Sequence, residues 1–113
     1  MPLTREFKET VRKRVERDSK FGEALLREGV ECLLSGDLET GKALLRDYIN
    51  ATVGFEALAE ITEKPAKSLM RMFGPNGNPQ ASNLFHVISL LQRQNGVSLE
   101  LATKPMRRGK GSH

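Results

Sequence analysis

Hydrophobic residues recur every three or four positions along most of this chain, which is the spacing of a helical face. In the first segment Phe7, Val11 and Val15 form a narrow apolar stripe among charged residues, with Thr4 placed to cap the helix. The later segments carry wider apolar faces, so we expect them to pack into a common core. The predicted helices span residues 4–17, 19–35, 38–53, 55–61, 65–73 and 82–95.

Polar residues and glycines mark where these helices begin and end. We expect Asp18 or Ser19 to cap the second helix, Gly36 to end it and Asp37 to cap the third. The third helix is predicted to place Leu44, Leu45, Tyr48 and Ile49 inward and Lys42, Arg46 and Asp47 outward, and to end at Gly54.

The strongest motif is a pair of short helices separated by a tight polar break. The first carries Phe55, Leu58, Ala59 and Ile61 on one face, and the break is Thr62 to Lys64. Pro65 suits the first position of a helix, where its missing N–H is not needed. This order predicts a helix-turn-helix.

The second helix of the motif has two distinct faces. Leu69, Met72 and Phe73 are predicted to face the core, whereas Ala66, Lys67, Met70 and Arg71 project outward. Such a small, basic, flexible face suits the DNA major groove, and Ser68 is placed to hold a phosphate. The predicted DNA-contacting residues are Lys64, Ala66, Lys67, Ser68, Met70 and Arg71.

The C-terminal part begins with a loop and ends with a basic tail. In the loop PNGNPQ, Asn76 and Gly77 suit positive φ angles. After the last helix Val97, Leu99 and Leu101 alternate with smaller or polar residues, the period of a short strand. That strand either adds to a partner's sheet or packs against the helices.

These elements predict an all-α fold, a compact bundle of five to six helices that contains a helix-turn-helix. We divide the chain into an N-terminal charged helix or arm (1–19), a helix-turn-helix domain (20–103) and a disordered basic tail (104–113). The charged helix is either a partner- or phosphate-binding arm or a solvated helix whose opposite charges pair.

The net charge of +4 lies at the C-terminus. Four of the 18 basic residues fall in the last ten positions and all 14 acidic residues precede them, so residues 1–103 are neutral. A role in DNA binding must therefore rest on local clusters of charge. Without a secretory signal or an apolar run of about 20 residues, we expect a cytoplasmic protein with no membrane partner.

Candidate catalytic residues are isolated from one another. His86 has no second histidine at ligand spacing, Cys32 is the single cysteine, and Glu56, Glu60 and Glu63 lie on the solvent side of a short helix. The chain has no phosphate loop or nucleophile elbow. We therefore predict no enzyme activity, metal, cofactor or small-molecule substrate.

The chain resembles the helix-turn-helix antitoxins of the HigA-like, addiction-module antidote type, whose DNA-binding unit is of the Cro/phage-repressor class. The resemblance covers about residues 21–105 and rests on LLSGDLETGKALLRDYI, FEALAEIT, KSLMRMF, GNPQASNLFHVISLL and VSLELATKP. It implies a homodimer on a palindromic DNA operator, repression of its own operon and neutralisation of a RelE/HigB-like ribonuclease toxin. Glu63 stands where the family often has Gly, and Lys64 where it often has an aliphatic residue.

Two alternatives remain open. One is a stand-alone transcriptional regulator of the same fold, without a toxin. The other is a helical protein-interaction module that does not bind DNA, which would show no salt-dependent binding to duplex.

Overall fold

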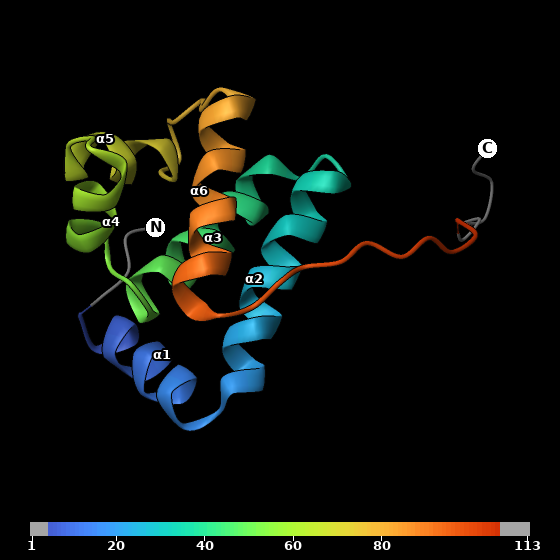
Figure 1. Cartoon of the computed structure of the whole chain (residues 1–113), viewed down its shortest axis with the longest axis horizontal. Helices are drawn as coiled ribbons and strands as arrows, with labels where there is room; N and C mark the ends of the chain where they lie inside the picture. Colours follow the sequence, from blue (N-terminus) through green and yellow to red (C-terminus); the bar gives the residue numbers. More distant parts are fainter. Residues whose placement is uncertain (1–4, 107–113) are drawn as a thin grey trace.

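Six helices follow one another in the computed structural model, which describes residues 5–106 (Figure 1). The all-α prediction is confirmed, but no strand forms among these residues, and 97–106 run on as extended chain without a partner. The short strand suggested by the alternation therefore does not form among residues 5–106, and Val97 and Leu99 instead pack against the helices, the second outcome expected for this segment. The helices are α1 (Arg5–Arg17), α2 (Ser19–Leu34), α3 (Leu38–Ala51), α4 (Phe55–Thr62), α5 (Ala66–Met72) and α6 (Ala81–Asn95).

Local sequence sets most helix ends. The Asp18 carboxylate accepts from the Lys20 N–H at 3.1 Å, and Asp37 accepts from the Thr40 N–H at 3.2 Å, so both predicted caps are confirmed. The cap predicted at Thr4, like most of the basic tail, lies outside the described residues.

The observed helix boundaries lie within one or two residues of the predicted ones, and two of the shifts have a local cause. Helix α3 ends at Ala51, because the Thr52 hydroxyl donates to the Tyr48 carbonyl at 2.7 Å and the chain then turns at Gly54, whose φ is 81°. Gly54 is the N-cap of α4 rather than the end of α3. Likewise Pro65 is the N-cap of α5, which begins at Ala66.

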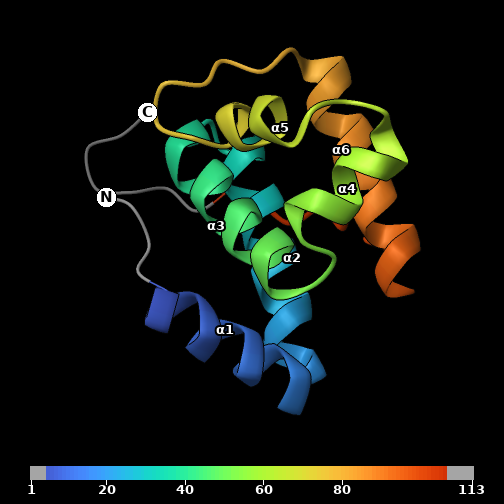
Figure 2. The same cartoon turned by 90° about the vertical axis from the view of Figure 1, so that its left-hand side faces the viewer.

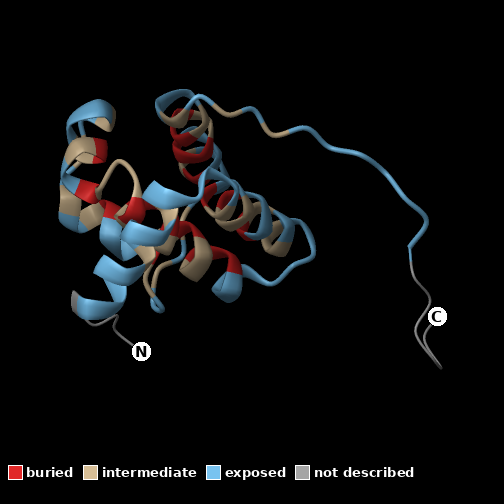
Figure 3. Cartoon of the chain, turned by 90° about the horizontal axis from the view of Figure 1, so that it is seen from below, coloured by how far each residue is buried: buried red, intermediate tan, exposed pale blue. Residues whose placement is uncertain are grey.

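One hydrophobic core joins α2 to α6. The buried faces of these helices turn toward each other, while their outer faces are exposed (Figure 3). Core leucines and an isoleucine with no exposed surface come from every one of the five helices: Leu26, Leu45, Ile49, Leu58, Leu69 and Leu91. Burial of such side chains contributes about 1.5–3 kcal/mol each, so the helix-turn-helix is held by tertiary packing.

Close approach of α2 and α3 depends on glycine. A Cβ at Gly41 would lie 2.7 Å from Leu33 Cδ2 and 2.9 Å from the Gly29 carbonyl oxygen. The two backbones therefore touch at this crossing, which brings α3 into the centre of the molecule.

Helix α1 lies across α2 and α3 at one end of the molecule (Figure 2). The Arg14 guanidinium sits 4.5 Å from the centroid of the Phe21 ring, a cation–π contact with α2. Val15 packs near Gly22, where an added Cβ would lie 3.1 Å from Val15 Cγ1. The apolar stripe of α1 is thus used for packing within the chain.

Candidate nucleic-acid interface

The turn between α4 and α5 is held by a residue in the left-handed region. Glu63 has φ 57° and ψ 35°, and the next N–H, that of Lys64, donates back to the Ala59 carbonyl at 3.2 Å. The Thr62 hydroxyl closes the same helix end by donating to the Leu58 carbonyl at 2.8 Å. Glu63 is the only non-glycine residue with positive φ among the residues described, and it occupies the position where glycine would be unstrained.

Replacing Glu63 with glycine is expected to raise the free energy of unfolding by about 0.5–1 kcal/mol, because glycine adopts this conformation without a Cβ clash. Valine at the same position should lower it by at least about 1 kcal/mol, since a β-branched side chain fits this region worst. Urea denaturation of Glu63→Gly and Glu63→Val measures both changes. Equal stabilities of these two variants would mean that the turn does not hold this conformation in solution.

The inward face of α5 anchors the helix in the core. Leu69 is fully buried and Phe73 is 1% exposed, with the Phe73 ring centroid 6.3 Å from that of Phe55 on α4. Met72 is partly buried against the same cluster. This face agrees with the predicted one.

The opposite face of α5 is open to solvent. Lys67, Met70 and Arg71 are exposed, and Met70 and Arg71 lie about one helical turn after Lys67. Three residues near the start of the helix are half-buried: Lys64, Ala66 and Ser68. Within residues 5–106 no ion pair involves Lys64, Lys67 or Arg71. Their positive charges are therefore free to meet an anionic partner.

The C-terminal end of α5 is held by two cations from α3. Lys42 is 1% exposed, and its Nζ donates to the Gly74 carbonyl at 2.9 Å and to the Gly77 carbonyl at 2.7 Å. Arg46 Nη1 donates to the Phe73 carbonyl at 3.3 Å. Cations at this end satisfy free carbonyl groups and complement the helix dipole. We call Lys42, Arg46 and the loop 74–77 the α5 clamp.

The prediction that Lys42, Arg46 and Asp47 face solvent is therefore wrong. Lys42 is buried and the other two are half-buried, because the loop after α5 folds back over α3 and α1 packs on its other side. The signal was present in the sequence: Lys42 lies at helical spacing from Leu38, Leu45 and Ile49, within the apolar face itself.

Gly77 closes the clamp by direct backbone contact. A Cβ there would collide with the Arg71 carbonyl oxygen and would lie 2.8 Å from that of Met72. Positive φ was predicted at Asn76 and Gly77, and neither has it. The glycine is needed for close approach to the end of α5, not for its backbone angle.

The solvent face of α4 is acidic. Glu56, Glu60 and Glu63 are all exposed on or just after this helix. A phosphate backbone is repelled by such a row of carboxylates, so an approach to DNA must be made by the α5 side of the motif.

Burial shifts the titration of Asp47 on α3. Desolvation raises the pKa of its carboxyl above the ordinary value of 3.8, and the neighbouring Arg46 charge opposes this only in part. Its Oδ1 atom is buried without a hydrogen bond. The ionised form is thus destabilised in the folded chain.

Replacing Asp47 with asparagine is expected to stabilise the fold at pH 7. Below about pH 3.8 Asp47 is protonated in both the folded and the unfolded chain, so it does not lower the free energy of unfolding. Because its pKa is higher in the folded chain, its ionisation lowers the free energy of unfolding as the pH rises through the folded pKa. Urea midpoints of the variant and the original chain should therefore differ at pH 7 and converge toward pH 3. The exposed Glu28→Gln change serves as the control, and a gap independent of pH would contradict the assignment.

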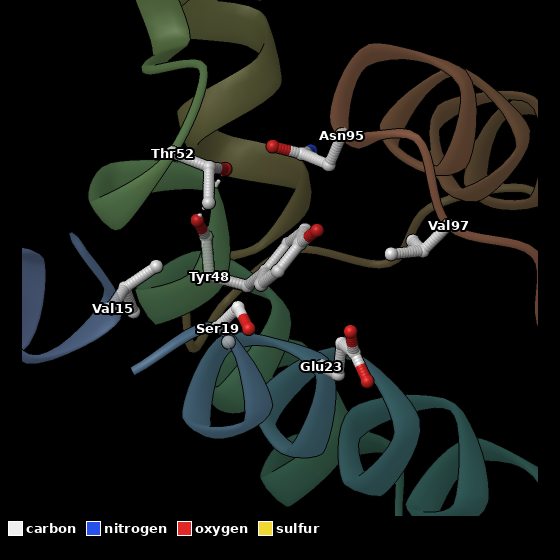
Figure 4. A pocket seen from close by; sticks show the side chains of 8 residues that line it. Val15, Ser19, Glu23, Tyr48, Thr52, Asn95 and Val97 are labelled. Atoms are coloured by element: carbon white, nitrogen blue, oxygen red, sulfur yellow. Dashed lines mark hydrogen bonds between the residues drawn. The ribbon is translucent and has the colours of Figure 1, made fainter. Parts of the chain in front are cut away.

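A second polar region lies away from the motif. A cavity of about 150 Å³ between α1, α2, α3 and the end of α6 is lined by Ser19, Glu23, Tyr48 and Asn95 among others (Figure 4). Burial, and secondarily the Glu23 carboxylate, raise the pKa of the Tyr48 phenol, which therefore stays protonated. These groups do not form a nucleophile and base pair.

Other candidate chemistry stays dispersed. His86 is exposed on α6, and Cys32 is half-buried on α2. In the described part of the chain, no three potential metal ligands gather. Nor does any helix between residues 5 and 106 have the length and apolar character needed to cross a bilayer.

No protein-family model, curated protein or solved structure matches this chain. A function has to be inferred from its own residues and their arrangement.

Proposed function

We propose that this chain is a sequence-specific DNA-binding protein whose helix α5 enters the major groove. The observation that carries the proposal is the exposed face of α5, where Lys67, Met70 and Arg71 stand together while both ends of the helix are fixed. A rigid short helix with an unpaired basic face is what groove recognition requires.

Each residue of this face has a distinct role in the proposal. Arg71 donates two parallel hydrogen bonds to a guanine edge, and Lys67, one turn earlier, reaches a guanine or a phosphate. Met70 between them offers an apolar contact for a thymine methyl group. Lys64, Ala66 and Ser68 lie near the start of α5, where backbone and side-chain donors position a phosphate.

The biological role follows from the resemblance to HigA-like antitoxins. In this role a cytoplasmic homodimer binds a palindromic operator, represses its own operon and neutralises a RelE/HigB-like toxin. A stand-alone repressor without a toxin uses the same α5 surface. An adjacent reading frame encoding a small basic toxin distinguishes the first role from the second.

The experiment that tests DNA binding compares the duplex upstream of the chain's own reading frame with a shuffled duplex of equal length. Fluorescence anisotropy at several salt concentrations should give at least about 1,000-fold tighter binding to the upstream duplex, and weaker binding of both as salt rises. Equal affinity for the two duplexes would remove the repressor role.

A protein-interaction role is the second candidate, and the acidic outer face of α4 favours it. Glu60 directly precedes the exposed Ile61, which is 39% accessible, and a neutral body lacks the general attraction to DNA. In that case neither duplex binds and the affinity shows no salt dependence.

A further inference from the structure

The chain after α6 begins with Val97 and Leu99 packed against the core and then continues as an arm that the rest of the molecule does not cover. Its start is tied down, because the Val97 N–H donates to the Gln92 carbonyl at 3.0 Å and the Leu99 N–H to the Gln92 side-chain oxygen at 2.8 Å. Further on, Leu101 is 80% and Met106 91% exposed. We call residues 97–106 the C-terminal arm.

The arm leaves the molecule on the side away from α4 and α5 (Figures 1 and 3). Among the residues described, no hydrogen bond ties residues 100–106 to the helices. An extended, apolar segment with free backbone groups is suited to pairing with another chain.

A groove that matches the arm lies beside its own root. It is enclosed by Glu23, Leu26 and Arg27 of α2 and by residues 97–100, and it holds about 220 Å³ of free volume. Its apolar lining comes from the partly buried Val97 and Leu99 beside Leu26, whereas Glu23 and Glu100 add two carboxylates against the single Arg27 guanidinium. An apolar side chain carried on a basic segment fits this groove.

We propose that the groove receives the arm of a second copy of this chain, with Leu101 entering it and Lys104 facing Glu23 and Glu100. The charges are complementary, since every ionisable side chain after Glu100 up to Lys110 is basic. Extended chain advances about 3.3 Å per residue, so Lys104 lies about 10 Å beyond Leu101, within reach of the rim.

A second copy fits better than the arm's own chain. Leu101 directly follows the residues that form one wall of the groove, and at 80% exposure it does not occupy the groove of its own chain. In a two-fold dimer each copy supplies one arm and one groove, and both are filled at once.

This inference rests on the proposed function only for the expectation of a dimer. The arm and the exposed face of α5 lie in different parts of the molecule (Figure 1), so each surface can be changed while the other is kept. The association is therefore measured without DNA.

The test is sedimentation velocity of the full chain over a range of concentrations. The unchanged chain should sediment as a dimer, and Leu101→Asp should raise the dissociation constant at least about 100-fold, because a charge replaces an apolar side chain at two symmetric contacts. Ala102→Asp carries the same charge one residue along, on the other side of the extended arm, and should remain a dimer. Circular dichroism of all three chains checks that the helices are intact.

Charge exchange tests the groove itself. Glu23→Arg should weaken the dimer, and adding Lys104→Glu to that variant should restore it. A Lys67→Ala/Arg71→Ala chain should stay dimeric, which separates this contact from DNA binding. A monomer at all concentrations, a dimer unaffected by Leu101→Asp, or equal effects of Leu101→Asp and Ala102→Asp would each overturn the proposal.

Discussion

Replacing Lys42 with methionine is expected to lower the free energy of unfolding by about 2–4 kcal/mol, although the side chain keeps most of its length. The change removes the donor of two short hydrogen bonds, so the Gly77 carbonyl loses its partner and the Gly74 carbonyl keeps only the bond from the Gly77 N–H. An unpaired buried carbonyl costs about 1–3 kcal/mol. Urea denaturation followed by circular dichroism measures the loss.

Glu39→Gln is the matched control for this variant. Glu39 pairs with Lys42 at 3.1 Å, but its side chain is 65% exposed, so we expect a change below about 1 kcal/mol. If Lys42→Met and Glu39→Gln had equal small effects, Lys42 would not hold the loop, and the α5 clamp would be wrong.

Replacing Gly77 with alanine is expected to cost about 1–3 kcal/mol, the typical penalty for forcing a group into filled space. The new methyl group meets the last carbonyl groups of α5, which are backbone atoms and cannot rotate away. The loop must move, and the end of α5 must move with it. In this chain we therefore also expect weaker binding to the upstream duplex.

Gly74→Ala provides the comparison. Its added Cβ would lie 3.4 Å from the Met70 carbonyl oxygen, close to ordinary contact, and its backbone angle does not require glycine. We expect little loss of stability and unchanged DNA affinity. Equal losses at positions 74 and 77 would show that flexibility of the loop, rather than close approach, is what glycine provides.

Together these contacts explain how a helix of seven residues can be held in one orientation. Such a short helix is unstable alone. Here the left-handed turn at Glu63 fixes its start, Leu69 fixes its middle, and Lys42 and Gly77 fix its end. The orientation of the helix that carries Lys67 and Arg71 is thus set in the free chain, which would lower the entropic cost of the proposed binding to DNA.

The sequence was sufficient where the determinants are local. Asp18 and Asp37 cap the starts of α2 and α3 through contacts within a few residues, and the two faces of α5 follow from helical periodicity alone. The strand over 97–102 failed because alternation records only which side chains share a face. A strand also needs a neighbour, and the described part of the chain supplies none.

The sequence was insufficient where distant segments meet. The Lys42 ammonium donates to the carbonyl of Gly77, which lies 35 positions further along the chain. Helical spacing could place Lys42 on the apolar face, but no local window could identify its partner. The same holds for Asp47, which is partly desolvated although it occupies a nominally polar face of α3. Which residues contact DNA stays a prediction, since exposure of Lys67, Met70 and Arg71 permits that contact without requiring it.

The central claim is that the exposed face of α5 reads DNA, and a matched pair of double variants tests it most directly. Lys67→Ala/Arg71→Ala and Lys20→Ala/Arg93→Ala each remove one lysine and one arginine from exposed positions, so they change the net charge equally. In anisotropy titrations of the upstream duplex, the first should lose at least about 100-fold in affinity and the second less than about threefold. Equal losses, or no loss in the first, would contradict recognition by α5.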